Sequence, residues 1–275
     1  MTTREALREG VRGLEERGVP SPRVDAEYLL AHALRVSRTD LYADERELED
    51  AEVGVFHALL RRRAAREPLA YILGEWGFRR LDLAVDARVL IPRPETEVVV
   101  ERCLERLRGL PEPRVLDIGT GSGAIALAIA DEHLGARVTA TDSSDEALAV
   151  ARENVRRTGL AARVQLVRGD LFAGAVGPFD LVVSNPPYVS RDELDSLQPE
   201  IRDYEPREAL IGEGVAVAIA ERARDVLRSG GWLVLECANG QAGEVAAELR
   251  SLGYADVLPT PDLAGRDRVV EARRP

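Results

Sequence analysis

The chain has 275 residues, of which 37 are basic and 48 acidic, so its formal net charge is −11. Apolar residues make up 45 % of the chain, which excludes wholesale disorder and is typical of one large or two smaller globular domains. The longest apolar runs are about eight residues, whereas a membrane-spanning helix needs about 20, so we expect no transmembrane segment. The charged N-terminus does not resemble a secretory signal peptide, and we expect a cytoplasmic protein.

The composition also restricts the chemistry that the protein can perform. All 37 basic residues are arginines, which excludes a Schiff base and a P-loop lysine. Cys103 and Cys237 form neither a zinc-ligand pattern nor a disulfide scaffold, and His32 and His57 lack partners at metal-binding spacing, so we expect no metal site. The acidic balance argues against direct nucleic-acid binding, which depends on neutralising phosphates with basic side chains.

The first part of the chain has apolar residues at helical spacing. Helices are predicted over Arg4–Arg17, from Pro22 to Leu34, and from Asp50 to about Ala65. Ser21 before Pro22 is typical of an N-cap and a first helical position. A short helical turn is expected over Pro68–Leu73. Residues 1–74 therefore predict a small helical bundle domain.

The segment 75–94 changes from helical to alternating periodicity. Strands are predicted at Leu81–Val85 and Val89–Ile91, with a turn at Asp86–Arg88 between them. The two strands would form a β-hairpin that links two domains. Pro92 and Pro94 bracket Arg93 and stiffen the exit from this hairpin.

Strand and helix patterns alternate from residue 95 to the C-terminus. The predicted helices span Glu95–Leu107, Ala124–Leu134, Asp145–Thr158, Val215–Leu227 and Gln241–Leu252. The predicted strands span Val115–Ile118, Val138–Thr141, Val164–Val167, Phe179–Ser184, Trp232–Glu236, Asp256–Leu258 and Arg268–Ala272. Such alternation predicts a parallel α/β sheet that is covered by helices on both faces.

A glycine-rich turn follows the first of these strands, in the segment Asp117–Gly123. Its glycines permit a tight turn and the close approach of a ligand to the backbone. Asp142 ends the next strand, where a carboxylate can accept hydrogen bonds from ribose hydroxyls. The glycines also fit the dinucleotide fingerprint of dehydrogenases, and a purely structural turn is a third interpretation. Asp117 favours a cofactor with an ammonium group over one with a pyrophosphate, and the loop resembles that of S-adenosylmethionine-dependent methyltransferases.

The strand Phe179–Ser184 leads directly into Asn185-Pro186-Pro187-Tyr188. This tetrapeptide resembles the motif of methyltransferases that act on a planar nitrogen, either a base amine or a side-chain amide; the alternative is a proline-rich turn without a function. Such a nitrogen is a poor nucleophile, so positioning it in line with the methyl group can supply much of the catalysis. We expect the Asn185 side-chain oxygen and the Pro186 carbonyl to accept its N–H bonds and Tyr188 to stack on the planar group.

Together the motifs resemble one family, the peptide chain release factor glutamine methyltransferases (the HemK or PrmC family). The resemblance is carried by Ser21–Glu27, Pro68–Glu75, Ile91–Glu97, Asp117–Gly123, Asn185–Tyr188 and Tyr204–Leu210. It implies an α/β fold with a class I S-adenosylmethionine-dependent, Rossmann-like methyltransferase domain at 95–275. It further implies an N-terminal helical domain at 1–74, which helps to dock the substrate, and a β-hairpin linker at 75–94.

The resemblance also implies the reaction and its residues. A methyl group passes from S-adenosylmethionine, with S-adenosylhomocysteine as product, to N5 of the glutamine in the Gly-Gly-Gln motif of class I translation release factors. The implied cofactor residues are Asp117, Gly119, Thr120, Gly121, Ser122, Gly123, Asp142, Asp170, Leu171 and Asn185. The implied substrate residues are Arg93, Glu95, Asn185, Pro186, Pro187 and Tyr188, of which Asn185, Pro186 and Tyr188 are also the implied catalytic residues.

Some positions leave alternatives open. Arg93 and Glu95 either approach the active site or merely stiffen a linker, and the same alternatives hold for Tyr204–Pro206. Leu171 stands where relatives often have an aromatic residue, so it can pack on an adenine but cannot stack on it. Cys237 and the residue after it depart from the family's usual Ile-Gly, which we interpret as a packing variation.

Three other functions remain open from the sequence alone. A DNA adenine methyltransferase would share the tetrapeptide, but the acidic charge and the absence of a basic stripe speak against it. A glutamine methyltransferase that acts on a ribosomal protein would use the same pocket. A cofactor-binding protein without activity would leave the joint presence of Asn185 and Tyr188 unexplained.

Overall fold

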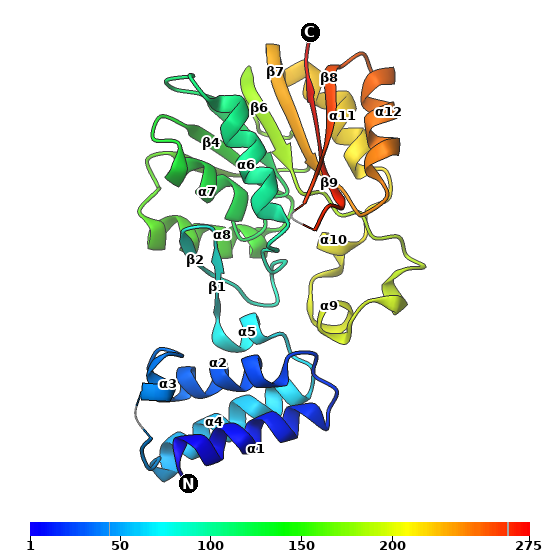
Figure 1. The fold of residues 1–275 in the computed structure, drawn as a ribbon. Helices are drawn as coiled ribbons and strands as arrows, with labels where there is room; N and C mark the ends of the chain where they lie inside the picture. Colours follow the sequence, from blue (N-terminus) through cyan, green and yellow to red (C-terminus); the bar gives the residue numbers. More distant parts are fainter. Residues whose placement is uncertain (44, 263) are drawn as a thin grey trace. The chain divides into compact units, whose positions relative to one another are not determined.

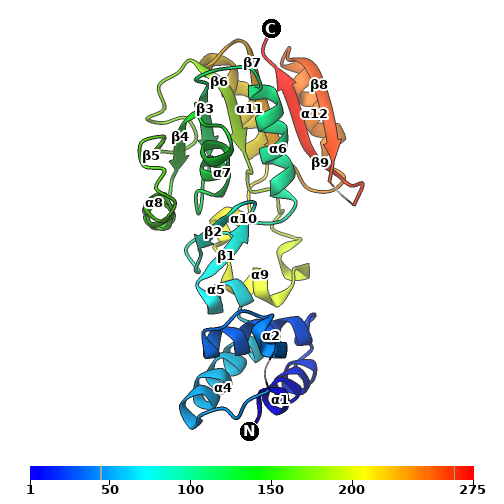
Figure 2. The ribbon, with the colours of Figure 1, turned by 60° about the vertical axis from the view of Figure 1, so that its left-hand side comes forward.

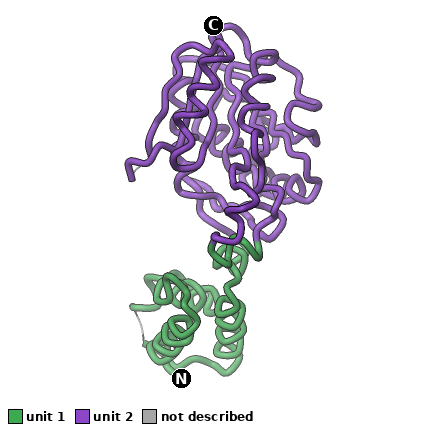
Figure 3. Tube along the Cα trace, turned by 90° about the vertical axis from the view of Figure 1, so that its right-hand side faces the viewer, with its two compact units in different colours: residues 1–74, 198–204 green, residues 75–197, 205–275 purple. Residues whose placement is uncertain are grey.

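The computed structural model describes residues 1–43, 45–262 and 264–275. They form two compact units, of which one comprises Met1–Gly74 with Gln198–Tyr204 and the other Glu75–Leu197 with Glu205–Pro275 (Figure 3). Residues 198–204 thus pack with the helical unit, although the sequence pattern places them inside the methyltransferase domain. Within the described part of the chain, no helix is long and apolar enough to cross a membrane.

The first unit is a helical bundle, as its apolar spacing predicts. Its helices are α1 (Thr3–Glu15), α2 (Pro22–Leu34), α3 (Asp40–Ala43), α4 (Asp50–Ala64), α5 (Leu69–Leu73) and α9 (Pro199–Tyr204). Phe56 of α4 and Leu29 of α2 are fully buried in its core. Ser21 lies at the N-cap of α2 as expected, but its side chain makes no capping hydrogen bond. The short helices α3 and α9 were not predicted, because four to six residues carry too little periodicity.

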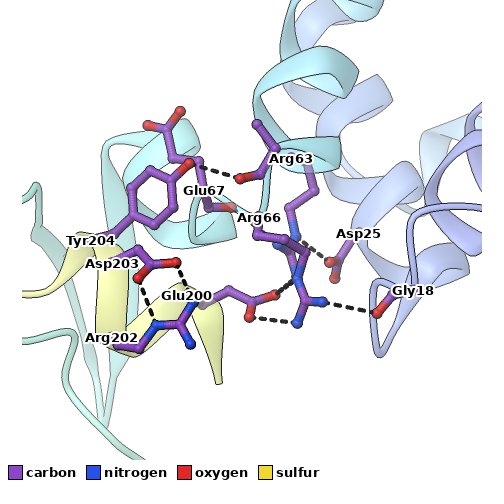
Figure 4. A network of polar contacts seen from close by, with 10 residues as sticks. Gly18, Asp25, Arg63, Arg66, Glu67, Glu200, Arg202, Asp203 and Tyr204 are labelled. Carbon is purple, nitrogen blue, oxygen red and sulfur yellow. Dashed lines mark hydrogen bonds and ion pairs between the residues drawn. The ribbon is translucent and has the colours of Figure 1, made fainter. Parts of the chain in front are cut away.

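Buried charges attach α9 to the bundle within this unit (Figure 4). The Arg63 guanidinium donates to Asp25 Oδ2 at 2.7 Å and to Glu200 Oε1 at 2.8 Å. Arg66 donates to both oxygens of Glu200, at 2.7 Å each. The Tyr204 hydroxyl donates to the Ala65 carbonyl at 2.8 Å. The second unit's chain therefore enters the first unit for seven residues and is held there by paired charges.

The second unit begins with a β-hairpin, but its strands differ from the predicted pair. Strand β1 (Glu75–Phe78) pairs with β2 (Leu81–Ala84), whereas residues 89–91 form no strand, so the predicted pairing was wrong. The turn lies at Arg79, which adopts a left-handed conformation with φ 54°. Val89 and Ile91 are buried by packing. Their apolar character was therefore a packing requirement, which an alternating pattern cannot distinguish from strand pairing.

A seven-stranded sheet forms the centre of this unit, in the order β5-β4-β3-β6-β7-β9-β8. Its strands are β3 (Arg114–Ile118), β4 (Arg137–Asp142), β5 (Val164–Arg168), β6 (Phe179–Ser184), β7 (Leu227–Glu236), β8 (Ala255–Pro261) and β9 (Asp267–Arg273). The pairs from β5 to β7 are parallel, as predicted. The last two strands correct the prediction, because β9 runs antiparallel to both β7 and β8.

Helices cover both faces of the sheet (Figures 1 and 2). The helices of this unit are α6 (Thr96–Leu107), α7 (Ala124–Glu132), α8 (Asp145–Thr158), α10 (Arg207–Leu210), α11 (Val215–Val226) and α12 (Ala242–Ser251), with the 3-10 turn η1 (Leu194–Ser196). Helices α6, α7 and α8 share a core with one set of alternating strand residues, and α11 and α12 share a core with the other set. The alternation of side chains along each strand thus assigns each strand residue to one of the two helical layers.

Candidate functional site

Two loops leave the sheet at neighbouring strand ends. Ile118 ends β3 and Ser184 ends β6, and these two residues are partners in the parallel register. The Ser184 hydroxyl donates to the Ile118 carbonyl at 2.8 Å. Strand order reverses between β3 and β6, and in open α/β sheets this switch point at the carboxyl ends is where ligands bind. The glycine loop and the Asn-Pro-Pro-Tyr segment, far apart in the sequence, therefore begin side by side.

The glycine loop is held by the next strand, β4. The N–H groups of Gly119 and Thr120 both donate to the Thr141 carbonyl at 2.9 Å. Gly121 has φ 55°, a left-handed conformation, and a Cβ built there meets nothing within 4 Å. Glycine is therefore required at Gly121 by the backbone conformation, and the space beside it stays open toward a ligand.

Asp117 is a buried carboxylate with an unused oxygen. It is 1 % exposed, and Oδ2 accepts from the Thr120 hydroxyl at 2.6 Å. Oδ1 is buried and has no hydrogen-bond partner among the described residues. Burial raises the pKa of the Asp117 carboxyl to about 7. A buried carboxylate oxygen without a donor is costly, and a positive charge bound nearby would favour the ionised form of Asp117.

Asp142 lies at the carboxyl end of β4 and contributes to the wall of the pocket. Its two oxygens accept backbone N–H groups, Oδ2 from Gly121 and Oδ1 from Ser144, at 2.9 Å each. A carboxylate oxygen has two lone pairs, so each oxygen can still accept one bond from a hydroxyl. The predicted ribose contact is thus compatible with the two bonds that Asp142 makes to the loop.

Asn185 lies directly after β6 and is joined to two residues of other elements. Its Nδ2 donates to the Thr96 hydroxyl oxygen at 3.4 Å, and the Thr96 hydroxyl donates to Glu236 Oε2 at 2.7 Å. No described residue donates to Asn185 Oδ1. The amide thus presents its acceptor, rather than its donor, to an incoming ligand. Sequence reasoning missed Thr96 and gave Glu236 no functional role, because the contact depends on α6 lying over the end of β7.

The pocket at this switch point has a volume of about 640 Å³, within the usual range of about 300–1,000 Å³ for small-molecule sites. The sequence-predicted residues in its wall are Arg93, Gly119, Thr120, Gly121, Ser122, Asp142, Asp170, Leu171, Asn185, Pro186 and Pro187. The predicted residues Glu95, Asp117, Gly123 and Tyr188 do not contribute to the wall. All these residues belong to the second unit.

Tyr188 is half-buried just outside this wall. Its carbonyl accepts from the Gln241 side chain at 3.5 Å. Burial raises the pKa of its phenol further above physiological pH. The predicted stacking of Tyr188 on a planar substrate group stays a prediction.

The junction residues Arg93 and Glu95 both have partners in the structure. The Arg93 guanidinium binds both carboxylate oxygens of the buried Glu205, at 2.6 and 2.7 Å. Glu95 accepts from Arg266 at 3.3 Å. Arg93 lines the pocket and Glu95 does not, so only Arg93 reaches the space that both motifs share. Of the predicted segment 204–206, Pro206 also lines the pocket, whereas Tyr204 belongs to the helical unit.

Two further segments that sequence reasoning did not assign to the site also contribute to the wall. One is the stretch that leaves the hairpin, which contributes Ala87, Arg88, Val89, Leu90 and Pro92. The other is the region around α10 and α11, which contributes Glu208, Ala209, Ile211, Val215, Ala218 and Ile219. Their apolar residues were indistinguishable in sequence from ordinary core positions. Buried Asn154 secures the site indirectly, because it donates to the carbonyls of Ala84 and Ser122 and joins the hairpin to the glycine loop.

The fold and this site define a class of proteins. Residues 96–201 match the family model of the methyltransferase small domain. A solved methyltransferase from Pyrococcus furiosus shares the fold with a TM-score of 0.51 at 23 % identity, over 70 % of this chain and 89 % of that one. The chain is a class I, Rossmann-like methyltransferase with an additional N-terminal helical region.

The N-terminal region and the full-length relatives identify the family more narrowly. Residues 5–74 match the model of the PrmC N-terminal domain. A release factor glutamine methyltransferase from Deinococcus radiodurans is 45 % identical over 281 residues, which cover 100 % of this chain and 99 % of that protein. One from Moorella thermoacetica is 46 % identical with the same coverage. The chain belongs to the release factor glutamine methyltransferase family, which confirms the resemblance seen in the sequence.

Proposed function

We propose that this protein methylates N5 of the glutamine in the Gly-Gly-Gln motif of class I translation release factors, with S-adenosylmethionine as methyl donor. The observation that carries the proposal is the pairing of Ile118 with Ser184 in the parallel register. The glycine loop and the Asn-Pro-Pro-Tyr segment begin directly after these two residues, and both line one pocket. Membership of the family, whose relatives are named for this reaction, supports the choice of substrate.

The residues of the pocket fit this cofactor. Asp142 retains lone pairs for ribose hydroxyls. Asp117 does not line the pocket, but its buried carboxylate at the start of the glycine loop would favour an ammonium group bound beside that loop. Leu171 and Asp170 lie in the same wall, where Leu171 would pack on an adenine. When bound, the cofactor supplies an electrophilic methyl group, and S-adenosylhomocysteine is the product.

The task of the protein is to hold the amide nitrogen. Asn185 Oδ1 and the Pro186 carbonyl would accept its two N–H bonds, and Tyr188 would contact the flat amide group. These acceptors align the nitrogen and stabilise the positive charge that develops on it. The proton can leave once the methyl group has been transferred, so the proposal needs no general base. The reaction takes place in the cytoplasm if release factors are the substrate.

A mass-spectrometric assay tests this proposal. The purified protein, S-adenosylmethionine and an unmodified release factor are combined, and the Gly-Gly-Gln peptide is analysed. We expect a gain of one methyl group on the glutamine and no gain with Asn185→Ala. The matched control is Asn239→Ala, since Asn239 is exposed and outside the pocket.

Other outcomes would replace the proposal. Methylation of a ribosomal protein or of DNA adenine, with none on the release factor, would show that the pocket serves another substrate. Cofactor binding without turnover on any of the three would make the protein a non-catalytic binder.

A further inference from the structure

A chain of three polar side chains runs behind the predicted substrate acceptor. Glu236 is 1 % exposed and Thr96 4 %, so the inner two members are shielded from water. Thr96 donates to Glu236 at 2.7 Å, and Asn185 Nδ2 donates to Thr96 at 3.4 Å. The outer bond is long, as polar contacts in ligand-free active sites often are. The three residues come from α6, β7 and the loop after β6.

The fold explains why a carboxylate lies here. Val234 of β7 belongs to the core under α6, and Glu236, two residues later, points to the same face of the sheet. Thr96 is the first residue of α6, so Glu236 lies at the N-terminal end of that helix. A helix N-terminus carries partial positive charge and favours an anion. The charged groups around Glu236 are Arg93, Glu95 and Arg268, and the neutral but titratable phenol of Tyr188 lies near them.

The chemistry of the three groups determines the direction of the hydrogen bonds. An ionised carboxylate can only accept, so the single hydroxyl proton of Thr96 must be donated to Glu236. The Thr96 oxygen is then left with lone pairs alone, and it can bind Asn185 only through the amide N–H. The opposite orientation of the Asn185 amide would place two acceptors against each other and leave the N–H group without this partner.

We propose that Thr96 and Glu236 are positioning residues that hold the Asn185 amide with Oδ1 toward the substrate. This inference rests on the proposed function, because it assigns a task to Oδ1 in binding the glutamine amide. It explains why an ionisable group is buried at a point where a neutral side chain would avoid the cost of burying charge.

We call the hydrogen bonds from Asn185 through Thr96 to Glu236 the relay. The relay should make turnover depend on pH, which side chains that only pack together would not do. Burial raises the pKa of the Glu236 carboxyl to about 7. Below that pH the protonated carboxyl can donate to Thr96, and the Thr96 proton is then released to point at Asn185. Thr96 then no longer holds the Asn185 amide with Oδ1 toward the substrate. The kcat at saturating cofactor should therefore fall as the pH decreases through about 7.

Three variants test the relay by kinetics on the release factor. Thr96→Ser keeps the hydroxyl and should stay close to wild type. Thr96→Val keeps the shape of the side chain without the hydroxyl. The kcat should fall by about 10- to 100-fold, which is the usual effect of removing a hydrogen-bond partner that orients a functional side chain. Glu236→Gln can donate through its amide and should have a low kcat at every pH. Cofactor affinity should match wild type in Thr96→Val, whereas the melting temperature should fall modestly because the buried Glu236 loses its donor.

A second measurement does not depend on turnover. The side-chain amide resonances of Asn185, assigned by their absence in Asn185→Ala, should shift with pH near 7 in wild type and Thr96→Ser, and should not do so in Thr96→Val. Equal kcat and pH profiles in wild type and Thr96→Val, equal losses in Thr96→Ser and Thr96→Val, or resonances that ignore pH would each overturn the relay. Wild type that binds cofactor and shows the resonance shift, but does not methylate the release factor, would overturn only the proposed substrate.

Discussion

The Asp142 carboxylate binds the glycine loop through the backbone N–H of Gly121, at 2.9 Å from Oδ2. Its other oxygen accepts from the N–H of Ser144 at the start of α8. One side chain therefore links the loop after β3 to the helix after β4. Loss of this carboxylate should affect both the predicted ribose contact and the shape of the loop.

We expect Asp142→Ala to weaken binding of S-adenosylmethionine more than Asp142→Asn does. A hydrogen bond to a charged group contributes about 1.5–3 kcal/mol, which corresponds to a rise in Kd of roughly 10- to 150-fold. Asparagine keeps one acceptor oxygen and should have the smaller effect. Isothermal titration calorimetry on both variants measures the difference, and an unchanged Kd in Asp142→Ala would contradict the ribose assignment.

Asp117 predicts a pH dependence of cofactor binding. Burial raises the pKa of its carboxyl to about 7 in the ligand-free protein, and an ammonium group beside it would favour the ionised form. Affinity should therefore be constant above pH 7 and fall, at the limit about tenfold per pH unit, as the pH decreases below it. Titrations at several pH values, in two buffers of different ionisation enthalpy, should detect proton release on binding near pH 6.

Asp117→Asn provides the control for that pH dependence. The variant should bind the cofactor weakly at every pH, because its amide cannot carry the negative charge. The expected fall in wild-type cofactor affinity is at most about tenfold per pH unit. A wild-type affinity that stays constant between about pH 5.5 and 8.5 would show that Asp117 does not pair with the ammonium group.

The same carboxyl predicts a change in stability. Its pKa is raised in the folded state, so between its usual value and about 7 the folded protein retains a proton that the unfolded chain has lost. The contribution of Asp117 to stability is therefore present at low pH and is lost as the pH rises toward 7. Ligand-free Asp117→Asn should melt at a higher temperature than wild type at pH 8, with a smaller difference at pH 4. A lower melting temperature at pH 8 would contradict the assignment.

Asn185→Ala should affect turnover far more than cofactor binding. Removal of one group that stabilises developing charge commonly reduces kcat by about 100- to 1,000-fold. The cofactor keeps its contacts to the glycine loop and to Asp142, so its Kd should change little. Methyl transfer and calorimetry are measured on the same preparation, with Asn239→Ala as the exposed asparagine control. Near-normal turnover in Asn185→Ala would refute its role as an amide acceptor.

The buried arginine of the helical unit predicts a stability difference between neighbouring residues. Arg63→Ala leaves the buried Asp25 without its cation, whereas Glu200 keeps its pair with Arg66; breaking such a buried pair typically costs about 3–5 kcal/mol. Arg62→Ala, one residue away, breaks only the more exposed pair with Glu67 and should cost about 1 kcal/mol or less. Urea denaturation followed by circular dichroism compares the two variants, and equal losses would show that burial of the pair has no energetic consequence.

The local patterns of the sequence determined much of the architecture and both motifs. Helical spacing located α1, α2 and α4, and the alternation after residue 95 located the parallel strands within a few residues. The glycine loop and Asn185–Tyr188 were identifiable because turn chemistry and rare residue types are local properties. The strand pattern placed each motif directly after a strand, the family resemblance implied that the two serve one reaction, and the register of β3 and β6 showed that they begin side by side.

The tertiary structure alone decided which distant residues touch. The apolar segments on the two sides of residues 86–88 had similar patterns. Only packing determined that β2 pairs with the preceding strand β1 and that residues 89–91 lie outside the hairpin. Val89 and Leu90 instead line the pocket. The sequence pattern of residues 198–204 did not indicate that Glu200 binds Arg63 and Arg66. The contact of Thr96 with Glu236 joins residues 140 positions apart. Such contacts follow from the register of strands and the placement of helices over them, which depend on the whole core rather than on any window of sequence.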